Sequence, residues 1–466
     1  NNHMPEFIEG FQYDKEFEKR HQKREEKVNK IRTSAVKNLI EALGLKGALV
    51  LRKEVKEYWI FGDAMARINF SSDEILEICK TLSDESPVNR FIHSFLHRKF
   101  YLEGFESIKL LYNDLQKTGF GDKELSNVLI PLDQTQELWD FLSTLQTEIQ
   151  DEYWKSVYVH LYNVADEKKA YGLEKLLEYK RYFSAIDAAF RFASVIPTLL
   201  LMEILEKAGT EESIEKPSYK GHEIERIFEE LDKRDDTDKS KLIQLEWIYL
   251  PLLDSYGSHR NPKNLEEELT ANPEFFIDVL KWLYVTKDKI LLEKEREGMS
   301  DEVVKNRAKQ SYHLLNSWKK IPGMKDDYSI DEEELRDWID KVRALAKEVG
   351  RLEVADMEIG KMLAQYPENI KGWPNEIIFQ IIEDINSDSL NRNYSAAMSN
   401  KRSFTSRGAF DGGNIEREKA AYFEKLFKDH RNKYPNTAEI FKNMSKGYLR
   451  DARREDEEAE RNRLEY

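Results

Sequence analysis

Cysteine is almost absent from this chain, and so are long hydrophobic runs. Cys79 is the only cysteine among 466 residues, which excludes a disulfide scaffold within the chain and leaves no thiolate cluster for a structural zinc site. Such sparing use of cysteine fits a reducing compartment. No apolar run approaches the roughly 18 residues that a membrane span requires, and the first residues do not have the pattern of a signal peptide. We therefore expect a soluble, cytoplasmic protein without membrane contact.

Glycine and proline are also scarce, with 20 and 12 residues. Charged residues make up 35% of the sequence and hydrophobic residues 40%, including 23 Phe, 22 Tyr and 8 Trp. Few helix breakers together with much charge are typical of amphipathic helices with charged outer faces. A protein of 466 residues is too long for one ordinary core, so we expect two or three domains or an extended repeat array.

The helical segments indicated by the pattern are short and are separated by a few turn residues. The run 173–190 resembles the inner part of a tetratricopeptide-like hairpin, in which a small residue such as Ala185 or Ala188 lets two helices approach closely. No strict period is present. The predicted fold class is therefore all-α: stacked helical hairpins of a HEAT- or TPR-like degenerate α-solenoid, with a C-terminal helical subdomain. A pair of ordinary helical bundles is the alternative.

Local signals place several helix starts. Ser71 or Ser72 can cap a helix ahead of Glu74. Pro87 and Pro273 are expected at first helical positions, where the missing N–H is tolerated.

Breaks in the helical pattern divide the sequence into six segments, and the polar stretch around Pro217 is the clearest internal linker. The predicted organisation is a charged helical connector at 1–45, a helical-repeat domain at 46–209, the linker at 210–221, a second helical domain at 222–387, a Ser/Asn/Arg/Gly-rich loop at 388–416 and a helical hairpin at 417–466.

The sequence motifs that indicate a reaction centre are absent. There is no G-x-x-x-x-G-K-[ST] or G-x-G-x-x-G loop for a nucleotide and no G-x-S-x-G elbow. His93 and His97 would share a helix face, but without an H-E-x-x-H motif and beside Phe91 and Phe95 a structural role is favoured over a metal site. Cys79 is interpreted as a core cysteine. We predict no metal, no cofactor and no catalytic residues, and an enzyme with an unrecognised site is the third hypothesis.

The longest predicted break in the helical pattern is the loop 388–416. It is rich in Ser, Asn and Gly, and it carries four cations with no acid between Asp388 and Asp411. A loop of this length inside a domain is uncommon and is usually functional or disordered. Cations interleaved with aromatic rings are suited to a phosphate backbone or an acidic protein surface. The candidate partner-binding residues are Arg392, Tyr394, Lys401, Arg402, Phe404, Arg407 and Phe410.

The alternative for this loop is a disordered segment or a structural one that is tucked against the fold, in which its arginines bind helix-end carbonyls and nearby acids. As a partner, protein is favoured over nucleic acid because the formal net charge of −15 provides no global field that attracts phosphates. Nucleic-acid binding through residues 391–408 is the second hypothesis. If the loop is a contact site, removal of Asn391 to Gly408 should leave folding nearly intact.

Six runs in the second half of the sequence form a further set of signals. They are LEWIYLPLL at 245–253, PEFFIDVL at 273–280, LNSWKKIPG at 315–323, GRLEVADMEIG at 350–360, SRGAFDGGNIER at 406–417 and YPNTAEIF at 434–441. Together they resemble the C-terminal, all-helical region of very large bacterial proteins. Those proteins carry an effector or NTPase domain at the N-terminus and resemble conflict or phage-defence sensors. The resemblance covers about residues 242–457.

The resemblance implies a recognition or scaffold role without catalytic residues, and it implies that the sequence is a fragment of a larger protein. The sequence therefore predicts a non-catalytic α-helical recognition module, the sensor part of a bacterial defence-type protein. Its expected partner is a protein, either phage-derived or another domain of the same polypeptide. Contact with that partner would shift a remote domain through a difference in affinity between two states.

Overall fold

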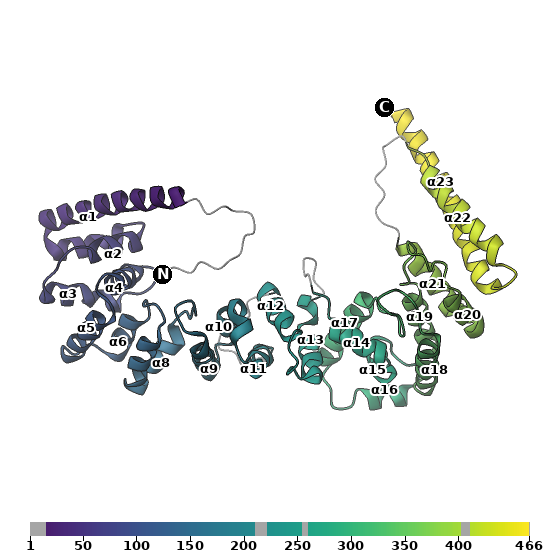
Figure 1. Ribbon diagram of the computed structural model, residues 1–466, viewed down its shortest axis with the longest axis horizontal. Helices are drawn as coiled ribbons and strands as arrows, with labels where there is room; N and C mark the ends of the chain where they lie inside the picture. Colours follow the sequence, from purple (N-terminus) through teal and green to yellow (C-terminus); the bar gives the residue numbers. More distant parts are fainter. Residues whose placement is uncertain (1–14, 210–220, 254–259, 402–410, 466) are drawn as a thin grey trace. The chain divides into compact units, whose positions relative to one another are not determined.

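The computed structural model describes residues 15–209, 221–253, 260–401 and 411–465. Within these residues the protein forms 23 α-helices and four short 3-10 helices, and it has no strand. The predicted all-α, helical-repeat-like fold is confirmed. The protein divides into two compact units, Asn1–Arg234 and Asp235–Tyr466. Figure 1 labels the helices of the two units, α1–α12 without α7 and α13–α23.

Unit 1 is built mainly of short helices. Its α-helices are α1 (Lys15–Leu51), α2 (Tyr58–Ala66), α3 (Ser72–Cys79), α4 (Arg90–Glu103), α5 (Phe105–Lys117), α6 (Asp122–Leu129), α7 (Gln136–Ser143), α8 (Thr147–Ser156), α9 (Lys169–Glu178), α10 (Tyr182–Ala189), α11 (Thr198–Ala208) and α12 (Gly221–Leu231). The 3-10 helices are η1 (Arg52–Glu54), η2 (Lys80–Ser83), η3 (Asp166–Lys168) and η4 (Phe190–Val195). The long α1 is kinked at Gly44, whose φ is 69°.

The helices of unit 1 pack against helices that lie close to them in the sequence. α4 packs on α2 and α5, and α10 packs on α9 and α11; Figure 1 shows this succession. Local packing of successive short helices is typical of helical-repeat proteins, in which each hairpin covers the apolar face of the next. The approach of α2 to α4 requires glycine, because a Cβ on Gly62 would lie 2.1 Å from the carbonyl oxygen of Phe91.

α12 belongs to unit 1, although the sequence pattern assigned it to a second domain beginning at residue 222. Its buried residues, including Ile227 and Phe228, pack on η4, α10 and α11. The boundary therefore falls between residues 234 and 235. Residues 210–220 of the predicted linker lie outside the described residues.

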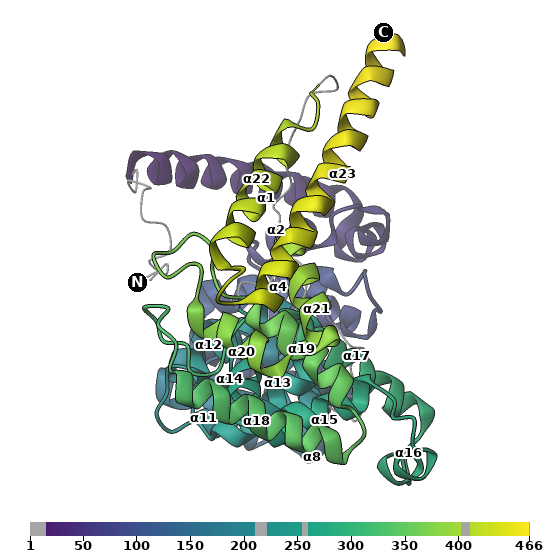
Figure 2. The same cartoon turned by 90° about the vertical axis from the view of Figure 1, so that its right-hand side faces the viewer.

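Unit 2 has a single hydrophobic core that extends from α13 to α23. At its centre the rings of Phe276, Trp318 and Trp338 lie with centroids 5.1–5.8 Å apart. The helices are α13 (Lys239–Leu253), α14 (Lys263–Ala271), α15 (Pro273–Leu283), α16 (Lys289–Glu295), α17 (Asp301–Ser317), α18 (Glu332–Glu348), α19 (Leu352–Leu363), α20 (Glu376–Ile385), α21 (Asp388–Asn400), α22 (Asn414–His430) and α23 (Pro435–Glu465). α22 and α23 form a long hairpin, which Figure 2 shows side-on.

The prediction of a loop at 388–416 is wrong over its first 13 residues, which form α21. Leu390, Tyr394 and Met398 recur at helical spacing and are all buried, so this segment carries an apolar stripe among its polar residues. The serines and asparagines bind backbone carbonyls instead of ending the helix: Asn393 Nδ2, for example, donates to the carbonyl oxygen of Ser389 at 2.8 Å. α22 begins at Asn414, and residues 402–410 lie outside the described residues.

α21 packs closely on α19 at Gly360. A Cβ on Gly360 would lie 2.4 Å from the carbonyl oxygen of Leu390, so the two backbones are in direct contact. Removal of Asn391 to Gly408 would take Tyr394 and Met398, which are 0% and 3% exposed, out of the core of unit 2. We therefore expect this deletion to destabilise unit 2, in contrast to the expectation from the sequence.

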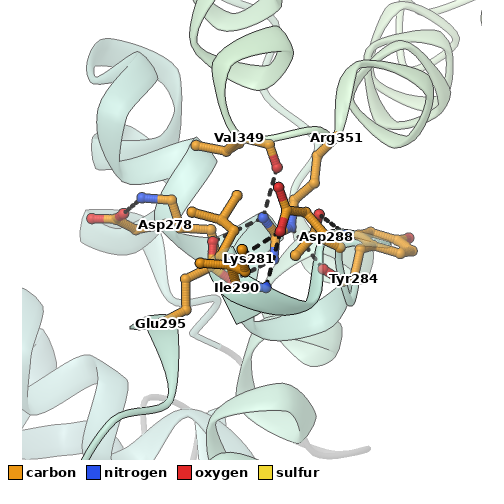
Figure 3. Close-up of polar contacts among 10 residues, drawn as sticks. Asp278, Lys281, Tyr284, Asp288, Ile290, Glu295, Val349 and Arg351 are labelled. Atoms are coloured by element: carbon orange, nitrogen blue, oxygen red, sulfur yellow. Dashed lines mark hydrogen bonds and ion pairs between the residues drawn. The ribbon is translucent and has the colours of Figure 1, made fainter. Parts of the chain in front are cut away.

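A buried arginine joins three helices of unit 2. Arg351, at the start of α19, is 3% exposed. Its two terminal nitrogens donate to the carboxylate oxygens of Glu295 at 2.9 and 2.6 Å. The same guanidinium donates to the carbonyl oxygens of Tyr284 and Val349 at 2.7 and 3.0 Å, as Figure 3 shows. Because those two residues cap the C-terminal ends of α15 and α18, Arg351 satisfies carbonyls that helix ends leave without an intrahelical partner.

Three arginines of unit 1 have the same role. In each case the guanidinium donates to a carbonyl oxygen near the C-terminal end of a helix. For Arg52 this is the helix that directly precedes it, and for Arg181 and Arg234 it is a helix further back in the sequence. The pairs are Arg52 with Leu49, Arg181 with Trp154 and Val157, and Arg234 with Ala193 and Ile196. Arginines that are buried (Arg52, Arg181 and Arg351) or half-buried (Arg234) thus repeatedly bind the carbonyl groups of helix ends in this protein.

Replacing Gly360 with alanine should destabilise unit 2, because the new Cβ must displace the backbone of α21. We expect the free energy of unfolding to fall by about 1–3 kcal/mol, the usual range for overpacking. Urea denaturation followed by circular dichroism measures this change. In the control Gly447→Ala the new Cβ meets nothing within 4 Å, and stability should rise by about 0.5–1 kcal/mol. Equal stability of the two variants would show that α19 and α21 do not pack as described.

Replacing Arg351 with methionine should have a larger effect, since it leaves the Glu295 carboxylate and two helix-end carbonyls without their donor. We expect a loss of about 3–5 kcal/mol, as for one partner removed from a buried ion pair. Arg336 provides the matched control, because its pairs with Glu332 and Asp384 lie at the surface with 32% of its side chain exposed. Arg336→Met should cost less than about 1 kcal/mol in the same denaturation assay. Similar losses in both variants would rule out a special role for Arg351.

Candidate functional site

The structure does not gather the described candidate residues at one place. Arg392 is exposed on α21, and its Nε donates to the carbonyl oxygen of Asp388 at 3.2 Å. Lys401 follows the C-terminal end of the same helix, and its Nζ donates to the carbonyl oxygen of Tyr366 at 2.6 Å. The two cations line different pockets. The other candidates, Arg402, Phe404, Arg407 and Phe410, lie outside the described residues.

Tyr394 is a core residue. Its side chain is 0% exposed, and burial raises the pKa of its phenol. A ring in this position cannot stack on a partner at the surface. The prediction of Tyr394 as a stacking group is therefore wrong for the folded protein.

One pocket of unit 2 surrounds Lys401, and we name it the Lys401 cleft. Its volume is about 750 Å³. Met398 and Lys401 line it from the end of α21, Lys419 and Tyr422 from α22, and Tyr448 from α23. The lining is completed by the turn after α19 and by two further residues of α22: Gln365, Pro367, Glu368, Asn369, Glu418 and Phe423.

Aromatic rings form one wall of the Lys401 cleft. Tyr422 is 41% exposed, and its hydroxyl accepts a hydrogen bond from Trp373 Nε1 at 2.6 Å. Next to it the rings of Phe423 and Tyr448 are stacked, with centroids 5.6 Å apart and planes inclined by 6°. The Nζ of Lys419 lies 5.9 Å from the centroid of Tyr448. The wall is thus held in place by packing while the ring of Tyr422 stays accessible.

The charges that line the Lys401 cleft are balanced. Glu368 and Glu418 face the same pocket as Lys401 and Lys419. Burial lowers the pKa of Lys401, and the nearby Glu368 opposes this effect. Lys401 Nζ already donates to a carbonyl near the end of α19, so one of its hydrogen-bond donors is used within the protein. The hydrogen bond of Lys401 therefore agrees with the structural alternative for the segment 388–416, whereas Arg392 is exposed and bonds only within its own helix.

Sequence reasoning did not identify Lys419, Tyr422 or Tyr448. One signal was present in the neighbouring aromatic residues Tyr422 and Phe423. Adjacent residues of a helix point about 100° apart, so both cannot be centred on one apolar stripe. The structure buries Phe423 and exposes Tyr422.

The histidines and the cysteine singled out from the sequence lie in unit 1. Burial lowers the pKa of His93, whereas His97 Nε2 lies 3.4 Å from an Asp133 carboxylate oxygen. Among the described residues, no group of three or more His, Cys, Asp or Glu is placed to hold a metal ion. Cys79 is 0% exposed, and burial raises the pKa of its thiol to about 12, against a smaller opposite effect of Lys99. The interpretation of Cys79 as a core residue agrees with this position.

Comparison of the sequence and structure with protein-family models, with curated proteins and with solved structures found no match. In the part of the protein that the structure describes, no helix is both long enough and apolar enough to cross a membrane.

Cys79 should be inert in the folded protein. We expect no reaction with a disulfide reagent such as DTNB at pH 8, because the side chain is buried and the thiol pKa is about 12. One thiol per molecule should react after unfolding in guanidinium chloride, and Cys79→Ala gives the blank. Because the folded pKa lies above the ordinary value of 9.0, the neutral thiol favours the folded state below that pH. This contribution is lost as the pH rises from 9.0 toward about 12. Rapid labelling of the native protein would contradict the buried position.

Proposed function

We propose that this protein is a non-catalytic α-helical recognition module that binds a protein partner, and that it is the sensor part of a larger bacterial defence-type protein. The observation that carries the binding proposal is the Lys401 cleft, in which an accessible aromatic wall lies between charges of both signs. The resemblance of residues 242–457 to the helical regions of defence sensors supports the second part.

The lining of the Lys401 cleft has the composition of a protein interface. Tyrosine, phenylalanine and methionine are enriched at the cores of such interfaces, and aromatic anchors contribute most of the binding energy. The hydrogen bond from Trp373 and the packing of Phe423 fix the orientation of Tyr422. Binding therefore immobilises little that was mobile before, which lowers its entropic cost.

A nucleic-acid backbone fits the Lys401 cleft less well. Glu368 and Glu418 in the lining would repel phosphates, and the Lys401 ammonium is already bound to a carbonyl oxygen. Opposite charges in one cleft instead favour a partner with complementary charges, which provides specificity. Arg402, Phe404, Arg407 and Phe410 follow Lys401 directly in the sequence and stay predicted contact residues.

A pull-down from bacterial lysate tests the proposal. The 466-residue protein serves as bait for lysates of phage-infected and uninfected cells, each with and without nuclease. We expect a nuclease-resistant protein to be retained by the wild type and lost by Lys419→Ala/Tyr422→Ala. Loss of an aromatic anchor costs about 2 kcal/mol or more, or roughly 30-fold in affinity. The control Tyr312→Ala removes a tyrosine that is 54% exposed on α17 and should retain the partner.

Two results would count against protein binding at the Lys401 cleft. Retention of nuclease-sensitive material alone would favour the nucleic-acid hypothesis. Equal retention of a protein by the wild type and the double variant would show that the partner binds at another surface. Thermal unfolding followed by circular dichroism establishes that the variants are folded before they are compared.

A further inference from the structure

We propose that a second pocket of unit 2, between α21 and α23, binds the backbone of an extended peptide segment. This inference rests on the proposed function, because it takes the partner to be a protein. The pocket has a volume of about 580 Å³. Four asparagines line it, and we name it the asparagine groove; they are Asn386, Asn391, Asn436 and Asn443.

The carboxamide of asparagine has the same hydrogen-bonding groups as a peptide unit. It offers N–H donors and a carbonyl acceptor, so that it can bind a backbone carbonyl and a backbone N–H whatever the side chains of the ligand are. Several carboxamides in one groove therefore suit an extended peptide, whose peptide groups are not paired with one another. The chemical class of the ligand follows from this match.

The side-chain oxygen of Asn391 has no hydrogen-bond donor among the described residues. This atom, Oδ1, is enclosed. An unsatisfied buried acceptor costs about 1–3 kcal/mol. Because this oxygen has no exposed surface, a peptide N–H can bond to it only after the carboxamide turns toward the groove, and binding would then recover part of that cost.

The spacing along α23 fits an extended ligand. Asn436 and Asn443 are seven residues apart and both line the groove, which corresponds to two helical turns or ~10.5 Å along the axis. An extended peptide rises by about 3.3 Å per residue. The two carboxamides therefore match peptide groups about three residues apart.

Other ligand classes fit the asparagine groove less well. Sugars and nucleobases are usually bound by stacking on aromatic rings, whereas the lining contains one apolar residue, Ile440, and no ring. A phosphate would meet Asp388 and Glu439 beside the single cation Arg392. The remaining polar ligand with alternating donors and acceptors is a peptide backbone.

The α23 wall of the groove is fixed before any ligand arrives. The carboxylate of Glu383 accepts hydrogen bonds from the backbone N–H groups of Asn436 and Thr437 at 3.1 and 2.8 Å and from the Thr437 hydroxyl at 3.0 Å. These contacts bind the first turn of α23 to α20. A preformed wall reduces the entropic cost of binding.

Peptide selection on the 466-residue protein tests the inference. A random peptide library displayed on phage is panned against the wild type, and the affinity of an enriched synthetic peptide is measured by fluorescence anisotropy. Asn391→Ala and Asn443→Ala should each raise Kd at least about tenfold, as expected for a lost hydrogen bond to the ligand. Alanine is the better helix former, so the helices should persist. The control Asn432→Ala, at an exposed position in the α22–α23 turn, should leave Kd within about twofold.

Chemical changes in the peptide separate backbone recognition from side-chain recognition. Methylation of a single backbone nitrogen removes one N–H donor and, at the contacted positions, should raise Kd at least about tenfold. Alanine substitution of most peptide side chains should change Kd by less than about threefold. The inference is overturned if no peptide is enriched, or if the selected peptides tolerate both methylation and the asparagine variants.

The Lys401 cleft variant distinguishes failure of this inference from failure of the proposed function. Suppose that a peptide no longer binds to Lys419→Ala/Tyr422→Ala but still binds to Asn391→Ala and Asn443→Ala. This result overturns the proposal that the asparagine groove binds peptides and supports protein binding at the Lys401 cleft. A peptide lost only by the asparagine variants supports the groove and assigns the cleft no part in binding that peptide.

Discussion

The fold depends on how helix ends are closed inside a stack of short helices. Every α-helix leaves its last carbonyl groups without intrahelical partners, and the described residues contain 23 α-helices. In buried turns these carbonyls need a donor from the protein, since an unsatisfied buried acceptor is costly. The planar guanidinium has five N–H donors, so a single arginine can serve two helix ends. Arg351 does this for α15 and α18 and also pairs with Glu295. It thereby fixes where α19 begins.

The position of α19 determines where the Lys401 cleft and the asparagine groove lie. α19 contacts α21 backbone to backbone at Gly360, and α21 carries the lining of both pockets. Asn391 belongs to the asparagine groove and Met398 to the Lys401 cleft, while Tyr394 between them is locked in the core. Under the two proposals, the aromatic cleft selects partner side chains and the groove binds the peptide backbone. α21 would then contribute both to the specificity and to the affinity of binding. The buried ring of Tyr394 fixes which face of this helix is turned to the core.

Signals confined to one turn of helix were the most reliable guide to local structure. The expected capping box at Ser71 and Glu74 is present, and Pro273 begins α15 behind the cap Asn272. Pro87 is an exception, because α4 begins only at Arg90. α21 was missed because its serines and asparagines outweighed a stripe of only three large apolar residues. Polar side chains can bind the backbone of their own helix, and composition alone does not distinguish that from a loop.

The sequence by itself determined the all-α class, the shortness of most helices and the absence of disulfide bonds within the molecule. These properties follow from composition and from interactions between residues three or four positions apart. Only the tertiary structure decided that Tyr394 faces the core, that Arg351 binds a carboxylate 56 residues away, and that Met398 and Tyr448 line one cleft. The physical reason is that each of these pairings depends on which helices pack together. The helical period shows that an apolar face exists, but it does not show which other helix covers it.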